Sequence, residues 1–196
     1  MAPVGGTRAG LRFSVLGPLT VTRDGEPVDL GGRRPKALLA TLLIAQGKMV
    51  TVDRLIDAVW GEHAPASALG SMHAYVTKLR RALEPHRRPR TPHGLLDRQG
   101  PGYVLRATPE TVDAERFVAL AERGSRLVAD DPVTAAETLS AALALWRGPA
   151  YADLGDSEVA TAEIARLESA RLTARQDHAA ARLAAGAAAE ALGDLE

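Results

Sequence analysis

The chain has 196 residues, of which 46% are hydrophobic, so it is long and apolar enough for one large domain or two small ones. Its 24 Lys and Arg balance 24 Asp and Glu, and the absence of cysteine excludes disulfides and thiolate metal sites. No apolar run approaches the roughly 20 residues that cross a bilayer, and the start, MAPVGGTRAG, lacks the apolar core of a signal peptide. We therefore expect a soluble, cytoplasmic protein without a membrane partner.

The balanced total charge hides a strong asymmetry between the two halves of the chain. Residues 1–111 contain 16 Lys and Arg against 9 Asp and Glu, a net charge of +7. Residues 112–196 contain 8 against 15, a net charge of −7. This pattern is typical of a nucleic-acid binder joined to a protein-interaction module. The alternative is two ordinary domains whose surfaces carry unequal charge.

The chain begins with a segment, residues 1–10, that we expect to be disordered, and a small antiparallel sheet follows it. Apolar residues at 11, 13 and 15 alternate with polar ones, which predicts a half-buried strand. The strand pattern resumes from Leu19 to Thr22, and Asp24–Gly25 predicts a tight turn. We expect Val28 to Leu30 to return as a short third strand.

Two helical patterns come next. The segment RPKALLATLLIAQG has a wide leucine face and ends at Gly47, which suits a helix C-terminus. Thr51 is the expected N-cap of VDRLIDAVW, and Gly61 lies just past the end of this second helix. We expect Trp60 to be buried between the helices.

A third helix is expected to begin near Pro65, which suits a first turn, and to run to about Leu83. Its apolar residues recur at spacings of three and four and define one stripe: Leu69, Met72, Val76, Leu79 and Leu83. The opposite face carries small, polar and basic residues: Ser67, Ser71, Ala74, Lys78 and Arg81. One face is therefore predicted to be core and the other to be free for a ligand.

A hairpin follows this helix after a loop rich in proline and arginine. The segment LLDRQGPGYVLRA predicts two short strands that turn at residues 99–102. Three helices and a hairpin form a winged helix, whose third helix enters the major groove of DNA, which is about 12 Å wide. Lys78 and Arg81 then reach bases or phosphates, and Arg98 or Gln99 at the hairpin tip reaches the minor groove. The alternative is an amphipathic helix whose basic residues are only solvated.

The second half is predicted to be entirely helical. We expect a helix capped by Asp113 that reaches about Val128, a second over 133–146, and a long third over 159–184. Gly186 is expected to interrupt this helix before a last short one near residue 187. The spacing of helix pairs resembles stacked hairpins of the tetratricopeptide kind, and we expect the array to continue in a longer protein. The predicted fold is mainly α with small antiparallel β: a winged helix-turn-helix over 11–108, then a tetratricopeptide-like helical domain over 112–196.

Several segments also resemble a known family. LLATLLIAQGKMVTVDRLIDAVWG, SMHAYVTKLRRALEP and GPGYVL resemble the OmpR-type winged-helix domain. WRGPAYADL and ARLESARLTARQDHAAARLAAG resemble the bacterial transcriptional activation domain, in a form shortened at its C-terminal end. Their order is similar to that of the Streptomyces antibiotic regulatory protein (SARP) family, including AfsR-like regulators, over nearly the whole chain.

The resemblance implies a transcriptional activator of secondary-metabolite (antibiotic) gene clusters in actinobacteria. Such proteins bind direct repeats of double-stranded DNA as two protomers side by side, a homodimer on DNA, and contact RNA polymerase and its principal sigma factor. It implies base-reading positions at His73, Ala74 and Lys78, with lysine at 78 where arginine is commoner. It implies backbone contacts at Ser71, Tyr75, Thr77 and Arg80, and a wing contact at Gln99, beside Arg98. Arg81, on the outer face of the same helix, is also expected to contact the backbone.

Other chemistry finds little support in the residues. GGRRPK, at 31–36, lacks the spacing of a phosphate-binding loop. The five histidines have no metal-ligand spacing, and none pairs recognisably with a serine nucleophile and a carboxylate. We therefore expect neither an enzyme nor a cofactor. The competing function is a protein-interaction scaffold whose winged helix does not read DNA.

Overall fold

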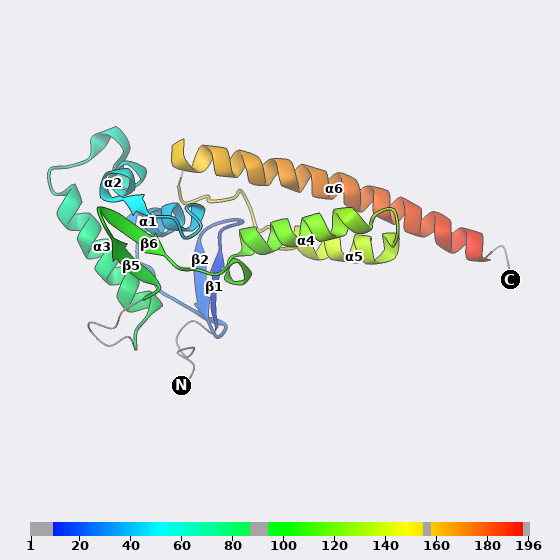
Figure 1. Cartoon of the computed structure of the whole chain (residues 1–196), viewed down its shortest axis with the longest axis horizontal. Coiled ribbons are helices and arrows are strands. Elements are labelled where there is room, and N and C mark those ends of the chain that lie inside the picture. Colours follow the sequence, from blue (N-terminus) through cyan, green and yellow to red (C-terminus); the bar gives the residue numbers. More distant parts are fainter. Residues whose placement is uncertain (1–9, 87–93, 155–157, 194–196) are drawn as a thin grey trace.

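The computed structural model describes residues 10–86, 94–154 and 158–193. The segment expected to be disordered, apart from Gly10, and most of the basic loop before the hairpin lie outside these ranges. Figure 1 shows an elongated molecule in which the helices of the first half occupy one end and α6 extends to the other. Within the described residues, none of the helices combines the length and apolarity needed to cross a membrane.

An antiparallel sheet opens the fold, as predicted, with strands β1 (Leu11–Ser14), β2 (Thr20–Arg23) and β3 (Glu26–Pro27) in that order. Asp24 and Gly25 both have positive φ, as a two-residue hairpin turn requires. The predicted third strand at Val28 to Leu30 was placed too late. Because the turn takes only two residues, pairing starts again at once, with Glu26 opposite Arg23.

Three helices and a second sheet complete the first half: α1 (Arg33–Ile44), β4 (Val50–Thr51), α2 (Val52–Trp60), α3 (Ala68–Leu83), β5 (Leu96–Gln99) and β6 (Gly102–Leu105). The strand order β4-β6-β5 makes β5 and β6 the predicted hairpin. Thr51 is the N-cap of α2, since its hydroxyl accepts the Arg54 N–H at 3.4 Å, and Gly61 ends that helix with a φ of 57°. These elements form the expected winged helix.

The start of α3 differs from the prediction. The helix begins at Ala68, not at Pro65, whose carbonyl instead accepts the Ala68 N–H in a turn. Ala68 is buried at 4% exposure, whereas Leu69 is 50% exposed. The apolar stripe therefore starts with a small residue and runs through Met72, Val76, Leu79 and Leu83, and Leu69 lies outside it.

The second half consists of α4 (Asp113–Leu127), α5 (Pro132–Leu143) and α6 (Glu158–Gly193), after the short 3₁₀ turn Pro109–Thr111. α4 and α5 pack as an antiparallel pair, and α6 runs along both (Figure 1). A Cβ at Gly124 would lie 2.5 Å from Cγ of Leu139, so glycine permits the close approach of α4 to α5. The predicted break at Gly186 was wrong: α6 is continuous, because one helical glycine costs only about 1 kcal/mol relative to alanine.

The buried face of α5 is narrow. It consists of Ala135, Leu139 and Ala142, whereas Ala136 and Leu143 are only half-buried. Trp146 lies beyond the end of the helix, where its ring packs edge-on against Phe117 at 5.3 Å between centroids.

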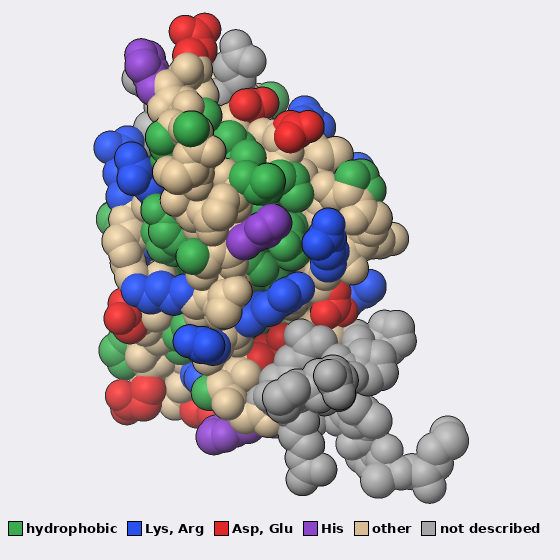
Figure 2. Space-filling model, turned by 90° about the vertical axis from the view of Figure 1, so that its left-hand side faces the viewer, with side chains coloured by type: hydrophobic (Ala, Val, Ile, Leu, Met, Phe, Trp, Pro, Cys, Tyr) green, Lys and Arg blue, Asp and Glu red, His purple; other side chains and the backbone are tan. Residues whose placement is uncertain are grey.

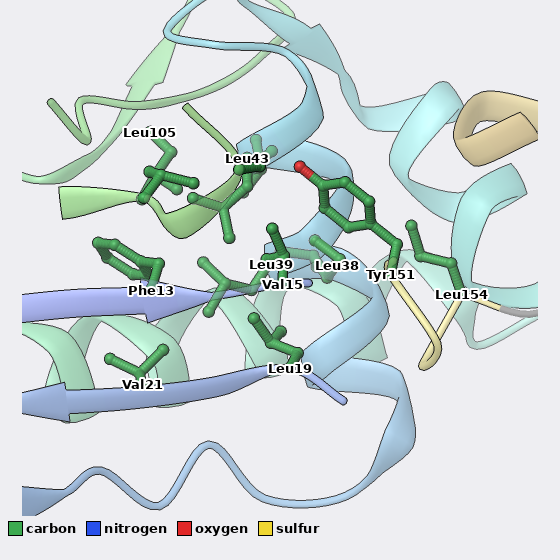
Figure 3. Close-up of a cluster of buried hydrophobic side chains, with 14 of the residues drawn as sticks. Phe13, Val15, Leu19, Val21, Leu38, Leu39, Leu43, Leu105, Tyr151 and Leu154 are labelled. Atoms are coloured by element: carbon green, nitrogen blue, oxygen red, sulfur yellow. The ribbon is translucent and has the colours of Figure 1, made fainter. Parts of the chain in front are cut away.

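The buried side chains of both halves form one continuous core. Tyr151 and Leu154, from the loop after α5, lie among Val15, Leu38 and Leu39 of the first half (Figure 3). Tyr151 is 3% exposed and has a φ of 52°, a conformation that is rare for residues other than glycine. The two halves are therefore joined by shared packing as well as by the chain.

Candidate nucleic-acid interface

α3 is held from behind by its apolar stripe. Met72, Val76 and Leu79 are fully buried against the rest of the first half, where α3 contacts both α1 and α2. Such burial contributes about 1.5–3 kcal/mol per large apolar side chain, which is enough to fix the orientation of the helix. The polar residues between them consequently point away from the core.

Two arginines fix the C-terminal end of α3. Arg23 of β2 donates hydrogen bonds to the carbonyls of Ala82 and Leu83, at 3.0 and 2.8 Å, and so pairs two of the carbonyls that the last turn of the helix leaves unbonded. Nε of Arg80 donates to the Leu96 carbonyl at 2.8 Å, and its guanidinium lies 5.6 Å from the Tyr103 ring centroid. Arg80 therefore ties the helix to the β5–β6 hairpin.

The outward face of α3 is small, polar and basic. Ala74, Thr77, Lys78 and Arg81 are exposed, and Ser71 and His73 are half-buried at its sides. The Thr77 hydroxyl donates to the His73 carbonyl at 2.9 Å. Lys78 lies against the loop before α1, since a Cβ at Gly31 would come 2.2 Å from its Nζ. Figure 2 views this end of the molecule and shows Lys and Arg side chains across the middle of the face.

Tyr75 contributes to the packing of α3 on α2. Its ring stacks on that of Trp60, with 5.9 Å between centroids, and the Arg34 guanidinium lies 5.7 Å from the same indole ring. Both aromatic residues are half-buried, so Trp60 is less buried between the helices than expected. Trp60 covers the side of the helix pair and does not fill its centre.

The hairpin places Arg98 and Gln99 in the open. Both are exposed on β5, opposite Tyr103 and Gly102, and the turn follows at Gly100 with a φ of 53°. A Cβ at Gly102 would lie 2.0 Å from the Val50 carbonyl oxygen, so only glycine lets β6 pair closely with β4. The wing is thus braced at its base, and its two polar residues lie at the free edge.

Sequence reasoning missed a polar joint between the two halves. Asp113 was expected to cap its own helix, but its carboxylate accepts the N–H groups of Val15 and Leu16, at 2.7 and 3.2 Å. It also pairs with Arg147, whose Nη2 lies 3.7 Å from Oδ2. Burial raises the pKa of Asp113, although these hydrogen bonds and the arginine oppose the rise. Local sequence patterns do not reveal this contact, because its partners lie about 98 residues before Asp113 and 34 residues after it.

The geometry defines a winged helix with an exposed basic face, joined to a helical domain, which is the architecture of a transcriptional regulator. Two family models match the chain: "Transcriptional regulatory protein, C terminal" over residues 25–105 and "Bacterial transcriptional activator domain" over 112–196. The chain belongs to the SARP family of regulators, as its resemblance predicted.

Its relatives are named as transcriptional regulators. The chain is 32% identical to RedD of Streptomyces coelicolor, over 95% of this chain and 53% of that protein. It is 37% identical to EmbR of Mycobacterium tuberculosis, over 95% and 48%, and 35% identical to AfsR of S. coelicolor, over 94% and 18%. The chain thus spans about half or less of the length of these relatives.

A solved structure shows the same fold. It is M. tuberculosis EmbR in complex with a low-affinity phosphopeptide, which the chain matches with a TM-score of 0.82 at 37% identity. The match covers 95% of this chain and 49% of that one. The predicted fold class, a winged helix followed by a helical domain, is confirmed.

Proposed function

We propose that the chain is a sequence-specific, double-stranded-DNA-binding transcriptional activator. In this proposal residues 11–108 read DNA and residues 112–196 form the activation domain. The observation that carries it is the outward face of α3, where Lys78 and Arg81 are exposed above a fully buried stripe. Within the described part of the chain neither side chain forms an ion pair, so both charges are available to phosphates or bases.

Direct readout is assigned to the centre of the helix. His73, Ala74 and Lys78 are proposed to face base edges in the major groove, where a lysine contacts guanine without the rigid fork of an arginine. Ser71, Thr77 and Arg81 are proposed to contact phosphates and fix the register of the helix. Arg98 or Gln99 is proposed to reach the adjacent minor groove.

Tyr75 and Arg80 are also proposed to contact the DNA backbone, in addition to their contacts within the protein. The stacking of Tyr75 on Trp60 and the hydrogen bond from Arg80 to Leu96 hold these side chains in one orientation. A side chain that is already ordered loses little conformational entropy when it binds. Both are therefore suited to fix the helix against the phosphates.

The partners follow from the family. We propose that two protomers bind direct repeats of DNA side by side and that the helical half contacts RNA polymerase and its principal sigma factor. The target is proposed to be a secondary-metabolite gene cluster, and the protein is proposed to act in the cytoplasm. The resemblance to the SARP family and the names of RedD and AfsR, both regulators of Streptomyces coelicolor, support the proposed target. The excess of acidic residues over 112–196 supports the proposed contact with another protein.

Footprinting on the DNA upstream of the protein's own gene and its neighbours tests the proposal. Two protected repeats on one face of the duplex are the expected result. Titrations of the protected duplex at increasing salt should then show a steep loss of affinity, because cationic side chains release counterions from phosphates. The scaffold alternative predicts no duplex binding at any salt concentration, and that result would reject the proposed function.

A further inference from the structure

We propose that the segment Arg147–Leu154, here called the docking loop, holds the helical half in one fixed orientation on the DNA-reading half. We further propose that Arg147 and Asp153 are positioning residues for transcription activation and not for DNA binding. This inference rests on the proposed function and assigns a role that the DNA-reading face does not explain.

Backbone hydrogen bonds form the first part of the joint. The Arg147 N–H donates to the Leu16 carbonyl at 2.7 Å, and the Tyr151 N–H donates to the Val15 carbonyl at 2.7 Å. The docking loop therefore pairs with the segment that connects β1 and β2, more than 130 residues earlier in the chain. Gly17 lets the two segments meet, since a Cβ there would lie 3.1 Å from Cβ of Arg147.

Side chains of the helical half also form hydrogen bonds to the segment of residues 15–19. The Asp113 carboxylate accepts the N–H groups of Val15 and Leu16, and Nη2 of Arg147 donates to the Pro18 carbonyl at 3.2 Å. The Asp153 carboxylate accepts the Leu19 N–H and lies 3.9 Å from Nζ of Lys36 on α1. Four of the five residues from 15 to 19 are thus hydrogen-bonded to the helical half.

This arrangement opposes rotation of one half against the other. A single linker contact would act as a hinge, whereas bonds distributed along a segment, together with the buried Tyr151 and Leu154, must break together. α3 lies at the end of the molecule away from α4, α5 and the C-terminal end of α6 (Figure 1). The docking loop therefore influences transcription through the orientation of the helical half.

Because the chain has no cysteine, spin labels at two introduced cysteines report one distance. We suggest Glu26→Cys on β3 and Ala179→Cys on α6, both exposed. The test variant is Arg147→Ala/Asp153→Ala. The matched control, Arg126→Ala/Asp130→Ala, removes one exposed arginine and one exposed aspartate elsewhere in the helical half. Each protein is measured for distance distribution, operator affinity and transcript yield from a promoter that contains the footprinted repeats.

The test variant should have a broader distance distribution than the unsubstituted and control proteins. Its transcript yield should fall by about tenfold, within the usual range of coupling between sites. Its operator affinity should change by less than about twofold, because the substitutions are distant from α3. If the double variant does not fold, Arg147→Lys offers a milder test, since it keeps the charge beside Asp113 but lacks the guanidinium that also bonds Pro18.

Three results would overturn the inference. An unchanged distance distribution with lost transcription would show that the docking loop acts by direct contact with polymerase. A broadened distribution with full transcription would show that fixed orientation is not needed. A parallel loss of operator affinity would place the docking loop in DNA binding. If the unsubstituted protein bound no duplex, the proposed function would fail, and this inference would fail with it. The spin-label distance distribution would still report whether the two halves are held in one orientation.

Discussion

At the scale of single residues, the three cations of α3 have different surroundings despite their proximity in sequence. Arg81 is exposed and extends from the helix, Lys78 lies beside Gly31, and Arg80 is half-buried between the helix and the hairpin. A sequence pattern gives all three the same charge. Their contacts predict three different effects of substitution on DNA binding.

Arg81→Ala should weaken binding to all duplexes alike. It should also reduce the slope of log affinity against log salt concentration by about one, as expected for one lost phosphate contact. Titrations of operator and random duplex at several salt concentrations measure both effects. The reference variant is Lys78→Ala, which should lose preference at one base step by roughly 1–3 kcal/mol. Equal losses of sequence preference in both variants would contradict the separate roles.

Arg80→Ala should weaken binding to all duplexes as well, and it should also loosen the wing, because the bond to the Leu96 carbonyl is lost. Amide hydrogen exchange of β5 measures the second effect. Arg81→Ala is its control because, among the described residues, no hydrogen bond or ion pair joins that side chain to the hairpin. Unchanged exchange in Arg80→Ala would show that the bond does not hold the wing.

Asp113 predicts a pH dependence of stability. Because burial raises its pKa, the folded protein keeps this proton at pH values where the unfolded chain has released it. The stability from this group is therefore complete below the pKa of an unfolded aspartate, about 3.9, and is lost as the pH rises through the folded pKa. Asp113→Asn removes this titration, so its free energy of unfolding should fall less steeply over that window.

Denaturant titrations of both proteins at a series of pH values test this expectation. The comparison uses the slope against pH and not the absolute stability, since the amide also changes the hydrogen bonds to Val15 and Leu16. Parallel curves for the two proteins would contradict a raised pKa.

At the scale of elements, the packing of α2 against α3 has a buried centre and a half-exposed aromatic side. Leu79 belongs to the centre, and Trp60 stacked on Tyr75 belongs to the side. The indole N–H of Trp60 has no hydrogen-bond partner among the described residues, which reduces the gain from its burial. The two residues should therefore differ in their contribution to stability.

Trp60→Ala should cost less than the about 3–5 kcal/mol typical of a large aromatic residue removed from a closed core, because part of its ring already contacts solvent. Leu79→Ala should cost the full amount for a buried leucine, about 2–5 kcal/mol. Urea unfolding curves of the two variants give the comparison. A loss of about 5 kcal/mol in the unfolding free energy of Trp60→Ala would contradict this expectation and would show that the aromatic stack belongs to the centre of the core.

The elements themselves were largely predictable, since local periodicity and caps determine them. The hairpin turn, the Thr51 cap and the extents of α2, α4 and the wing strands agree with the sequence patterns, whereas α1 ends at Ile44, before the predicted end at Gly47. The errors have local causes. The buried site at the start of the α3 stripe holds the small residue Ala68, and the pattern assigned the larger Leu69, one residue later, in its place. Gly186 was expected to end a helix, but a single glycine is too weak a helix breaker to do so.

At the scale of the whole molecule, the two halves depend on one another. Tyr151 and Leu154 fill space in the core of the first half, so that core is complete only when the helical half is docked (Figure 3). Nothing in the local pattern of residues 147–154 predicts this, because the contact partners lie near residue 15. Equally, the opposite net charges of the two halves suggested separate units and gave no sign of a shared core.

Tyr151→Ala should destabilise the whole chain by about 3–5 kcal/mol, as for other large aromatic residues removed from a core. Both halves should still unfold in one transition, followed by fluorescence of Trp60 in the first half and of Trp146 in the second, each studied with the other tryptophan replaced by phenylalanine. Tyr151→Phe keeps the buried ring, so its free energy of unfolding should fall much less than that of Tyr151→Ala. Two separate transitions in the unsubstituted chain would contradict the shared core.

The seating of Tyr151 and Leu154 also constrains how such regulators can be recombined. A chimera that joins the first half of one regulator to the second half of another, with the junction between residues 108 and 112, would pair residues 147–154 of one protein with the core of a different protein. The two surfaces would then not be complementary. Recombinants that transplant the 15–19 segment and residues 147–154 as a pair should be recovered in folded form far more often than those that split them.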